Sequence, residues 1–349
     1  MTQPVMLLVG GDPAQRTGGY GFDRRMALEL QALGQPVALQ GLAGRFPDMD
    51  GQARASLEGT LRSVPDDQLV VIDGLVLGGA PEVIEAHAGR LRLVALIHHP
   101  LGDETGLEEG VRERLDAGER RSLGAVCGLV TTSEHTARRL EDKGVTGARV
   151  VTPGTDPAAL TEGRVAPPWR LLCVASVVPR KDHRTLVDAL ARLTQYDWRG
   201  VCVGSLEADP ACASGLRKAI TDAGIGDRVE LTGELGDTAL NERYALADLF
   251  VLPTRYEGFG MAFTEAVARG VPVIAGDGGA VREAVPAEAA RFVPPGDPDA
   301  LARVLAGFMA DADERAALRA GARAGRERLA DWRGQARHLK QALDSFRDA

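Results

Sequence analysis

Two glutamates, Glu257 and Glu265, stand eight residues apart on either side of a glycine-rich segment. The apolar run at 248–252 predicts a buried strand before them, and the run that follows Gly260 predicts a helix. This order leaves unpaired backbone N–H groups at the start of the helix, where a phosphate is favoured. The two carboxylates would repel a phosphate but suit hydroxyl groups, so the pattern predicts a sugar nucleotide as ligand. The spacing alone is equally compatible with two solvated acidic side chains.

The elements that must position these glutamates alternate along the whole chain. Apolar runs predict strands at 5–9, 36–39, 69–73, 91–98, 128–133, 171–175, 200–204, 229–231, 249–252 and 271–275. Helices are predicted at 20–33, 81–87, 107–123 and 133–143, from near 182, 209, 238, 261 and 281, and over 298–347 with interruptions at Gly321, Gly325 and Gly334. Such alternation predicts parallel sheets that are covered on both faces. A linker is predicted at 153–168, where prolines and glycines gather. The predicted fold class is therefore α/β, with two tandem Rossmann-like, doubly wound domains that face each other across a cleft.

Length and composition limit the classes of protein to consider. A chain of 349 residues favours two domains, and 44% hydrophobic with 26% charged residues is typical of a globular protein. The net charge of −8 argues against a nucleic-acid partner. The N-terminus does not resemble a signal peptide and no apolar run is long enough to span a membrane, so we expect a cytoplasmic protein without a transmembrane segment. The four cysteines lack the spacing of a metal site and are expected to be buried free thiols.

Two further segments carry residues suited to phosphate binding. Gly18 and Gly19 open the first predicted helix, where a phosphate can approach the backbone, although a plain flexible turn is the alternative. Arg180 and Lys181 follow the first strand of the second half, just before a helix that Asp182 is expected to cap. These two cations could clamp a diphosphate and neutralise a departing nucleotide, or could be an ordinary solvated basic pair.

A histidine lies at the end of a predicted buried strand. His98 is placed there to hydrogen-bond a substrate hydroxyl or to relay a proton. His99 follows directly, and adjacent residues of a strand point to opposite faces, so the two are not expected to chelate one metal ion. No metal site is predicted.

Taken in order, these segments resemble the family 4 glycosyltransferases, which have the GT-B fold. The resemblance covers essentially the whole chain and is strongest at residues 251–265, with further matches at 153–156, 278–283 and 293–298. It implies that residues 1–160 form an acceptor-binding domain, residues 161–325 a donor-binding domain, and residues 326–349 a helix that packs back toward the first domain. It also implies a retaining transfer of a hexose-type sugar from a nucleotide-diphosphate donor, without a metal or other cofactor. The acceptor would be a hydroxyl of a small molecule, a lipid or a glycan.

The resemblance also implies roles for individual residues. Glu257 would contact the hydroxyls of the transferred sugar, and Glu265 would bind the ribose. Lys181 would bind the diphosphate, and His98 would lie near the donor sugar and the acceptor. The remaining donor-binding positions are backbone sites that hold sugar or phosphate, namely Gly18, Gly19, Gly258, Phe259, Gly260 and Met261.

One position departs from the family pattern. Ser176 stands where the family often has an arginine, and we expect Arg180 to supply the missing guanidinium. With Glu265 on the ribose, neither glutamate is placed as a nucleophile, so a same-face displacement is favoured over a covalent route. Alternatives are an epimerase or phosphorylase of the same fold, or an inert sugar-nucleotide-binding protein. The donor base and sugar, the acceptor and the oligomeric state are not readable from the sequence.

Overall fold

The computed structural model describes residues 3–347, and its contacts divide the chain into two compact units. The first unit comprises the chain up to Gly154 and again from Ala330 onward, and the second comprises Thr155–Leu329. The boundaries expected from the sequence were 160/161 and 325/326.

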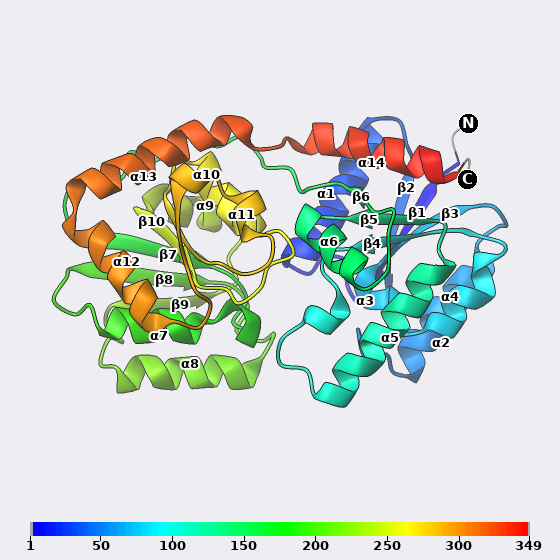
Figure 1. Ribbon diagram of the computed structural model, residues 1–349, viewed down its shortest axis with the longest axis horizontal. Helices are drawn as coiled ribbons and strands as arrows, with labels where there is room; N and C mark the ends of the chain where they lie inside the picture. The colour runs from blue at the N-terminus through cyan, green and yellow to red at the C-terminus, as the bar shows by residue number, and fades with distance from the viewer. Residues whose placement is uncertain (1–2, 348–349) are drawn as a thin grey trace. The chain divides into compact units, whose positions relative to one another are not determined.

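The first unit is a parallel sheet with helices on both faces (Figure 1). Within residues 3–347 its strand order is β2-β1-β3-β4-β5-β6. The strands are β1 (Val5–Gly10), β2 (Val37–Leu42), β3 (Leu69–Asp73), β4 (Arg92–Ile97), β5 (Gly128–Thr131) and β6 (Arg149–Val150). The helices are α1 (Gly18–Ala32), α2 (Gly51–Ser63), α3 (Gly74–Leu77), α4 (Pro81–Ala88), η1 (Leu101–Asp103), α5 (Glu109–Ala125), α6 (Glu134–Asp142) and α14 (Trp332–Arg347).

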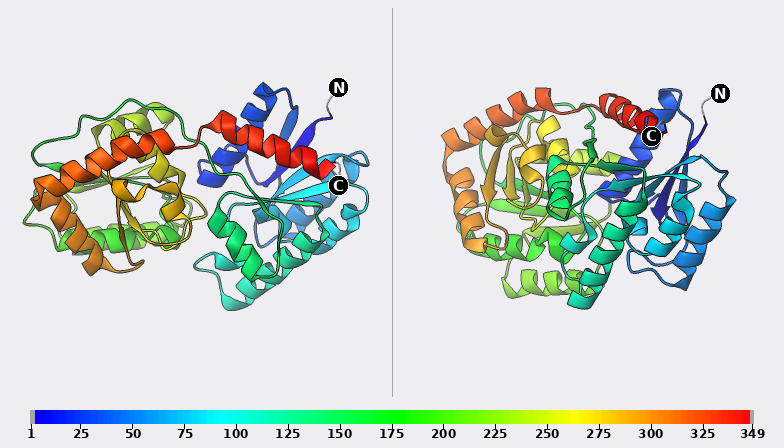
Figure 2. Two further views of the ribbon diagram at one scale, coloured as in Figure 1. Left: turned by 45° about the horizontal axis from the view of Figure 1, so that its top comes forward. Right: turned by 45° about the vertical axis from the view of Figure 1, so that its right-hand side comes forward.

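The central strands of this sheet are apolar on both sides, so both faces need a cover. Helix α14, from the far end of the chain, packs beside α1 on one face, as the two views of Figure 2 show. Helices α2, α4 and α5 cover the other face (Figure 1). Neighbouring residues of one strand enter different cores: Leu8 joins the α2–α5 side, and Leu7 lines a pocket with residues of α1 and α14.

The second unit repeats this architecture with its own core. Its strand order is β12-β11-β10-β7-β8-β9, all neighbours being parallel. The strands are β7 (Trp169–Val174), β8 (Trp198–Val203), β9 (Val229–Gly233), β10 (Leu249–Leu252), β11 (Val273–Gly276) and β12 (Ala290–Val293). The helices are η2 (Pro179–Lys181), α7 (His183–Ala191), α8 (Pro210–Asp222), α9 (Asp237–Leu246), α10 (Met261–Ala268), α11 (Val281–Ala284), η3 (Ala287–Ala289), α12 (Pro298–Ala310), α13 (Ala312–Gly325) and η4 (Arg326–Arg328). In Figure 1, α7, α8 and α12 lie on one face of the sheet and α9, α10 and α13 on the other.

The order of strands brings particular loops together. In the first unit β1, β3 and β4 are neighbours, so the segments that carry Gly18, Asp73 and His98 leave the same edge of the sheet. In the second unit β7, β10 and β11 are neighbours, which places the segments after them, with Lys181 and Glu257, at one edge. Among the described residues, none of the helices has the length and apolar character needed to cross a membrane.

The structure also contains elements that the sequence patterns did not predict. Helix α2 was missed because it is mostly polar and buries only Ala53, Leu57 and Leu61. Strand β6 was missed because it has only two residues, and β12 because Arg291 interrupts its short apolar run.

Two predicted helix interruptions were wrong. The first break within 298–347 falls at Asp311, whose side chain accepts hydrogen bonds from the first turn of α13. Gly321 lies inside that helix, where an added Cβ would stand 1.9 Å from the carbonyl oxygen of Glu288. The glycine therefore permits close packing rather than ending a helix. Gly334 likewise lies within α14, whereas Gly325 does end α13.

Candidate functional site

Two backbone hydrogen bonds between neighbouring loops hold Glu257 in place. Its N–H donates to the Gly278 carbonyl at 3.2 Å, and its own carbonyl accepts from the N–H of Ala280 at 2.9 Å. A Cβ at Gly278 or Gly279 would stand 2.1 Å from a backbone oxygen of the Glu257 loop. Glycine is therefore required at both positions, since any side chain would push the loops apart.

The carboxylate of Glu257 is buried and paired with cations. Lys181 Nζ donates to its two oxygens at 2.6 and 2.8 Å, and Arg180 Nη1 lies 3.7 Å from Oε2. Burial acts to raise the pKa of Glu257, but Lys181 and Arg180 outweigh it and hold the pKa below its usual value. Glu257 therefore stays a carboxylate at neutral pH, although only 4% of its surface is exposed.

A second set of bonds braces the cation segment against the Glu257 loop. The guanidinium of Arg180 donates to the Tyr256 carbonyl at 2.9 Å. The Arg180 carbonyl accepts from the N–H of Arg255 at 2.8 Å and from Thr254 Oγ1 at 3.1 Å. Arg255 Nε in turn lies 3.0 Å from a carboxylate oxygen of Asp182. Thr254 and Arg255 were not predicted as site residues, and nothing in their spacing identifies them.

Asp182 caps helix α7, as the sequence predicted. Its side chain accepts from the N–H of Thr185 at 3.4 Å. Its φ of 52° is left-handed, an uncommon conformation for a residue other than glycine. The sharp turn that results directs the chain from the two cations of η2 straight into α7.

Glu265 lies on α10, the helix that follows the Glu257 loop. Gly260 precedes α10 with a φ of 103°, which favours glycine, and the helix starts at Met261 as predicted. Tyr244 donates its hydroxyl to Glu265 Oε2 at 2.9 Å. Burial raises the pKa of Glu265 despite this bond. The guanidinium of Arg269 lies 4.6 Å from the centre of the Tyr244 ring and completes a cluster that the sequence analysis did not find.

In the first unit, His98 lies between two carboxylates. Its Nε2 is 3.3 Å from Asp23 Oδ1 and 3.3 Å from Asp73 Oδ2. Gly19 lies beside the ring, because a Cβ added there would stand 3.3 Å from His98 Cδ2. Gly18 opens α1, but a Cβ there would meet no atom within 4 Å. Neither aspartate was predicted from the sequence, although an acidic residue at the end of an apolar strand was a readable signal for Asp73.

These three side chains are also a candidate metal centre. Their ligand atoms lie within 4.8 Å of one another, and no other such group occurs among residues 3–347. His99 is separate from this group, since its Nε2 is 3.0 Å from Glu104. His98 and His99 thus contact different carboxylates, which agrees with the prediction that they do not chelate one metal ion.

The structure thus gathers the predicted residues into two groups. Glu257, Arg180 and Lys181 are in contact within the second unit, and the turn from Gly258 to Met261 leads on to Glu265. His98 and Gly19 are in contact within the first unit. Ser176 carries no cation, and the guanidinium of Arg180 lies beside Glu257.

The second unit also matches a known family. Residues 161–325 match the family model described as glycosyl transferases group 1. This part of the chain is a group 1 glycosyltransferase domain. For residues 161–325, this match agrees with the family predicted from the motifs.

Sequence similarity to two mannosyltransferases points to the same family. The chain is 36% identical over 193 residues to GDP-mannose-dependent alpha-(1-6)-phosphatidylinositol monomannoside mannosyltransferase of Mycobacterium tuberculosis, covering 51% of this chain and 48% of that protein. It is 33% identical over 233 residues to MMP alpha-(1->4)-mannosyltransferase of Mycolicibacterium hassiacum, covering 61% and 55%. The chain thus spans about half the length of the curated relatives it matches.

A solved structure shares the fold across the chain. Sucrose-phosphate synthase of Thermosynechococcus elongatus superposes with a TM-score of 0.81 and 22% identity, covering 99% of both chains. Together with the two parallel sheets, this confirms the predicted two-domain α/β GT-B fold class.

Proposed function

We propose that the chain is a retaining hexosyltransferase that takes its sugar from a nucleotide-diphosphate donor without a metal ion. The observation that carries the proposal is the buried Glu257 carboxylate, paired with Lys181 and Arg180 at the start of α10. This arrangement places a carboxylate that can accept hydrogen bonds from sugar hydroxyls next to two cations that can bind a diphosphate. The group 1 glycosyltransferase domain supports the reaction class.

In the proposed reaction the chain positions the donor and stabilises the departing charge. Glu257 accepts hydrogen bonds from the sugar, the backbone from Gly258 to Met261 contacts sugar and phosphate, and Glu265 binds the ribose. Lys181 and Arg180 stabilise the nucleoside diphosphate as the bond to the anomeric carbon breaks. The acceptor oxygen forms its bond on the same face, and its proton passes to the departing phosphate. Neither glutamate acts as a nucleophile.

GDP-mannose is the donor to test first. The two relatives described above are mannosyltransferases, and the name of the Mycobacterium tuberculosis protein specifies GDP-mannose. The acceptor is an unidentified hydroxyl of a small molecule, a lipid or a glycan. Because this acceptor is unknown, the first experiments use the donor alone.

Binding of the donor is expected to raise the melting temperature of the chain. A ligand at 100 times its dissociation constant stabilises the folded state by about 2.7 kcal/mol. Differential scanning fluorimetry with GDP-mannose, UDP-glucose and the free nucleotides identifies the preferred donor. Glu265→Gln is expected to weaken the shift through loss of the ribose contact, with Glu288→Gln, a surface residue paired with Arg328, as the matched control. A donor panel without any shift would refute the proposal.

A further inference from the structure

Three polar side chains from separate elements of the first unit converge on one point. Asp23 lies on α1, Asp73 ends strand β3 and His98 follows strand β4. The nitrogen Nε2 of His98 is 3.3 Å from Asp23 Oδ1 and 3.3 Å from Asp73 Oδ2, and the three atoms lie within 4.8 Å of one another. Because all three elements belong to the first unit, the cluster is complete within that unit.

Two of these three atoms have no hydrogen-bond partner among residues 3–347. They are Asp23 Oδ1 and His98 Nε2, and both atoms are buried. Asp23 as a whole is only 2% exposed. The separation of 3.3 Å is longer than the roughly 2.7–2.9 Å of a charge-assisted N–H···O bond. Polar atoms buried in this way almost always have a partner, so the cluster is built to receive a further group.

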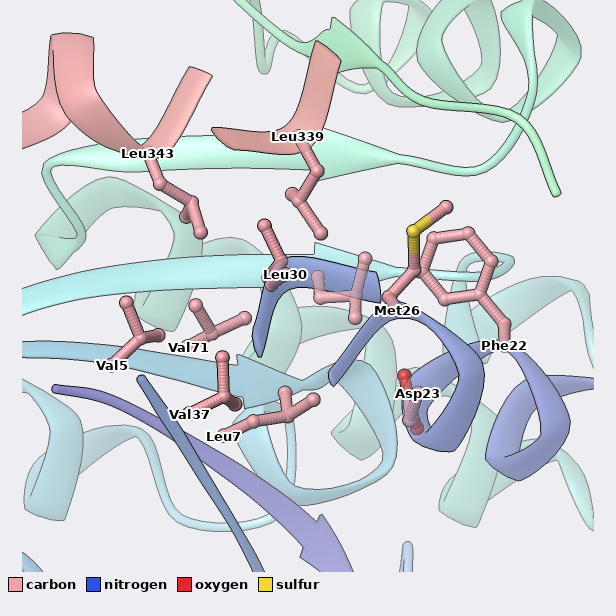
Figure 3. Close-up of a pocket in the computed structure, with 11 residues that line it drawn as sticks. Val5, Leu7, Phe22, Asp23, Met26, Leu30, Val37, Val71, Leu339 and Leu343 are labelled. Carbon is pink, nitrogen blue, oxygen red and sulfur yellow. The ribbon is translucent and has the colours of Figure 1, made fainter. Parts of the chain in front are cut away.

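The two carboxylates also lack sufficient positive charge. When ionised, Asp23 and Asp73 carry two negative charges, of which a protonated imidazole would balance one. Arg24 follows Asp23 in the chain but donates to the backbone carbonyls of Pro13 and Gln15 instead. Figure 3 shows Asp23 among the side chains that line a pocket between α1, the sheet and α14, and the other lining residues are apolar. An uncompensated carboxylate in such surroundings is costly, whereas a divalent cation would balance both.

Other contacts fix the positions of two of these residues. The second oxygen of Asp73, Oδ1, accepts from the N–H of Leu75 at 2.9 Å, which leaves Oδ2 to face the cluster. The backbone carbonyl of His98 accepts from Thr132 Oγ1 at 3.3 Å and from Thr136 Oγ1 at 3.2 Å. Ligands that are oriented by such outer contacts need little rearrangement to bind an ion.

We propose that Asp23, Asp73 and His98 bind one divalent transition-metal ion of the Zn²⁺ class, through the three atoms that converge. The proposed transfer needs no metal ion, so this site goes beyond that function and does not rest on it. The side chain of His98 is 19% exposed, so a solvent molecule can take the fourth position of a tetrahedral site.

The distances and the types of ligand favour Zn²⁺ over Mg²⁺ and Ca²⁺. Ligand atoms around a tetrahedral Zn²⁺ with bonds of about 2.0–2.1 Å lie about 3.3–3.4 Å apart, which agrees with both distances to His98 Nε2. Adjacent ligands of an octahedral Mg²⁺ lie closer together, at about 2.9 Å. Mg²⁺ and Ca²⁺ also prefer oxygen ligands, whereas an imidazole nitrogen suits Zn²⁺.

The inference is tested by titrating the full chain with Zn²⁺ after a chelator has removed any bound metal. Isothermal titration calorimetry is expected to show one tightly bound Zn²⁺ per chain. X-ray absorption spectroscopy of the loaded chain should show nitrogen and oxygen ligands without sulfur. The chain also has free cysteines, and a Zn–S bond would reveal binding to these instead. Absence of tight binding, or a Zn²⁺ ion held by sulfur, would overturn the inference.

Variants of single ligands then show which residues hold the ion. Asp23→Asn keeps the shape of the side chain but removes its charge. We expect it to weaken Zn²⁺ binding by more than about 100-fold, the upper end of the loss caused by groups outside the coordination sphere. His98→Gln should have the same effect and decides the question if Asp23→Asn does not fold. His99→Gln, which removes the adjacent histidine paired with Glu104, is the matched control and should keep full affinity. Unchanged binding in folded Asp23→Asn or in His98→Gln would overturn the inference.

Discussion

Glu257→Gln is expected to reduce nucleotide release from the donor by about 10²–10³-fold, the loss typical of removing one preorganised electrostatic group from an active site. The substitution keeps the shape of the side chain but removes the charge that accepts hydrogen bonds from the sugar and orients Lys181 at 2.6 Å. Glutamine can still accept one hydrogen bond, so donor binding should fall much less than turnover. Coupled-enzyme detection of the nucleoside diphosphate measures the rate.

The control for this variant is Glu288→Gln, which removes a charge from an exposed ion pair with Arg328. It should keep full activity. Near-normal turnover in Glu257→Gln, with normal turnover in the control, would remove Glu257 from the mechanism.

Lys181→Met is expected to abolish transfer and also to destabilise the second unit. Among residues 3–347, the cation that then remains beside the buried Glu257 carboxylate is Arg180, 3.7 Å away. Removing one partner of a buried ion pair typically lowers the free energy of unfolding by about 3–5 kcal/mol. Because Arg180 remains beside Glu257, the loss should lie at or below the lower end of this range. Urea denaturation measures the stability. Lys218→Met, which breaks an exposed pair with Asp222, is the matched control.

The double variant Lys181→Met, Glu257→Gln separates structure from catalysis. With both charges removed, most of the lost stability should return, while transfer should remain absent because the sugar and diphosphate contacts are gone. Recovery of transfer in the double variant would show that the pair is structural only.

The stability that the Glu257–Lys181 pair contributes should change with pH in a definite direction. In the unmodified chain the pKa of Glu257 is held below its usual value, so its contribution to stability is present above that value and is lost as the pH falls through the folded pKa. In Lys181→Met the pKa of Glu257 should rise, because burial then dominates. Acidification below pH 5 should therefore narrow the stability gap between the two proteins.

The sequence predicted which residues gather at the Glu257 site better than it predicted how they are held. Glu257 and Lys181 each follow a recognisable apolar strand, so their place at a strand end could be inferred from local pattern. That β10 and β7 are neighbours could not, because strand order depends on packing across the sheet. The bonds of Arg255 and Thr254 to the Lys181 segment depend on that adjacency and were therefore missed.

Asp23 shows a different limit. In the sequence it stands next to Arg24 and Arg25 and has the appearance of a solvated helix face. It is buried in a pocket that is also lined by Leu339 and Leu343 of α14, more than 300 residues along the chain. Tyr244 was missed for a similar reason, since its contact with Glu265 joins α9 to α10. Long-range packing, which short sequence patterns do not encode, positions all of these groups.

The most direct test of the proposed function is ¹H NMR of the chain incubated with its preferred nucleotide sugar and no acceptor. A retaining transferase should release nucleoside diphosphate slowly, together with a sugar that first appears in the donor's own anomeric configuration, and Glu257→Gln should lose this release. Release of the 2-epimer, first appearance of the opposite anomer, or binding of the donor without any release would contradict the account.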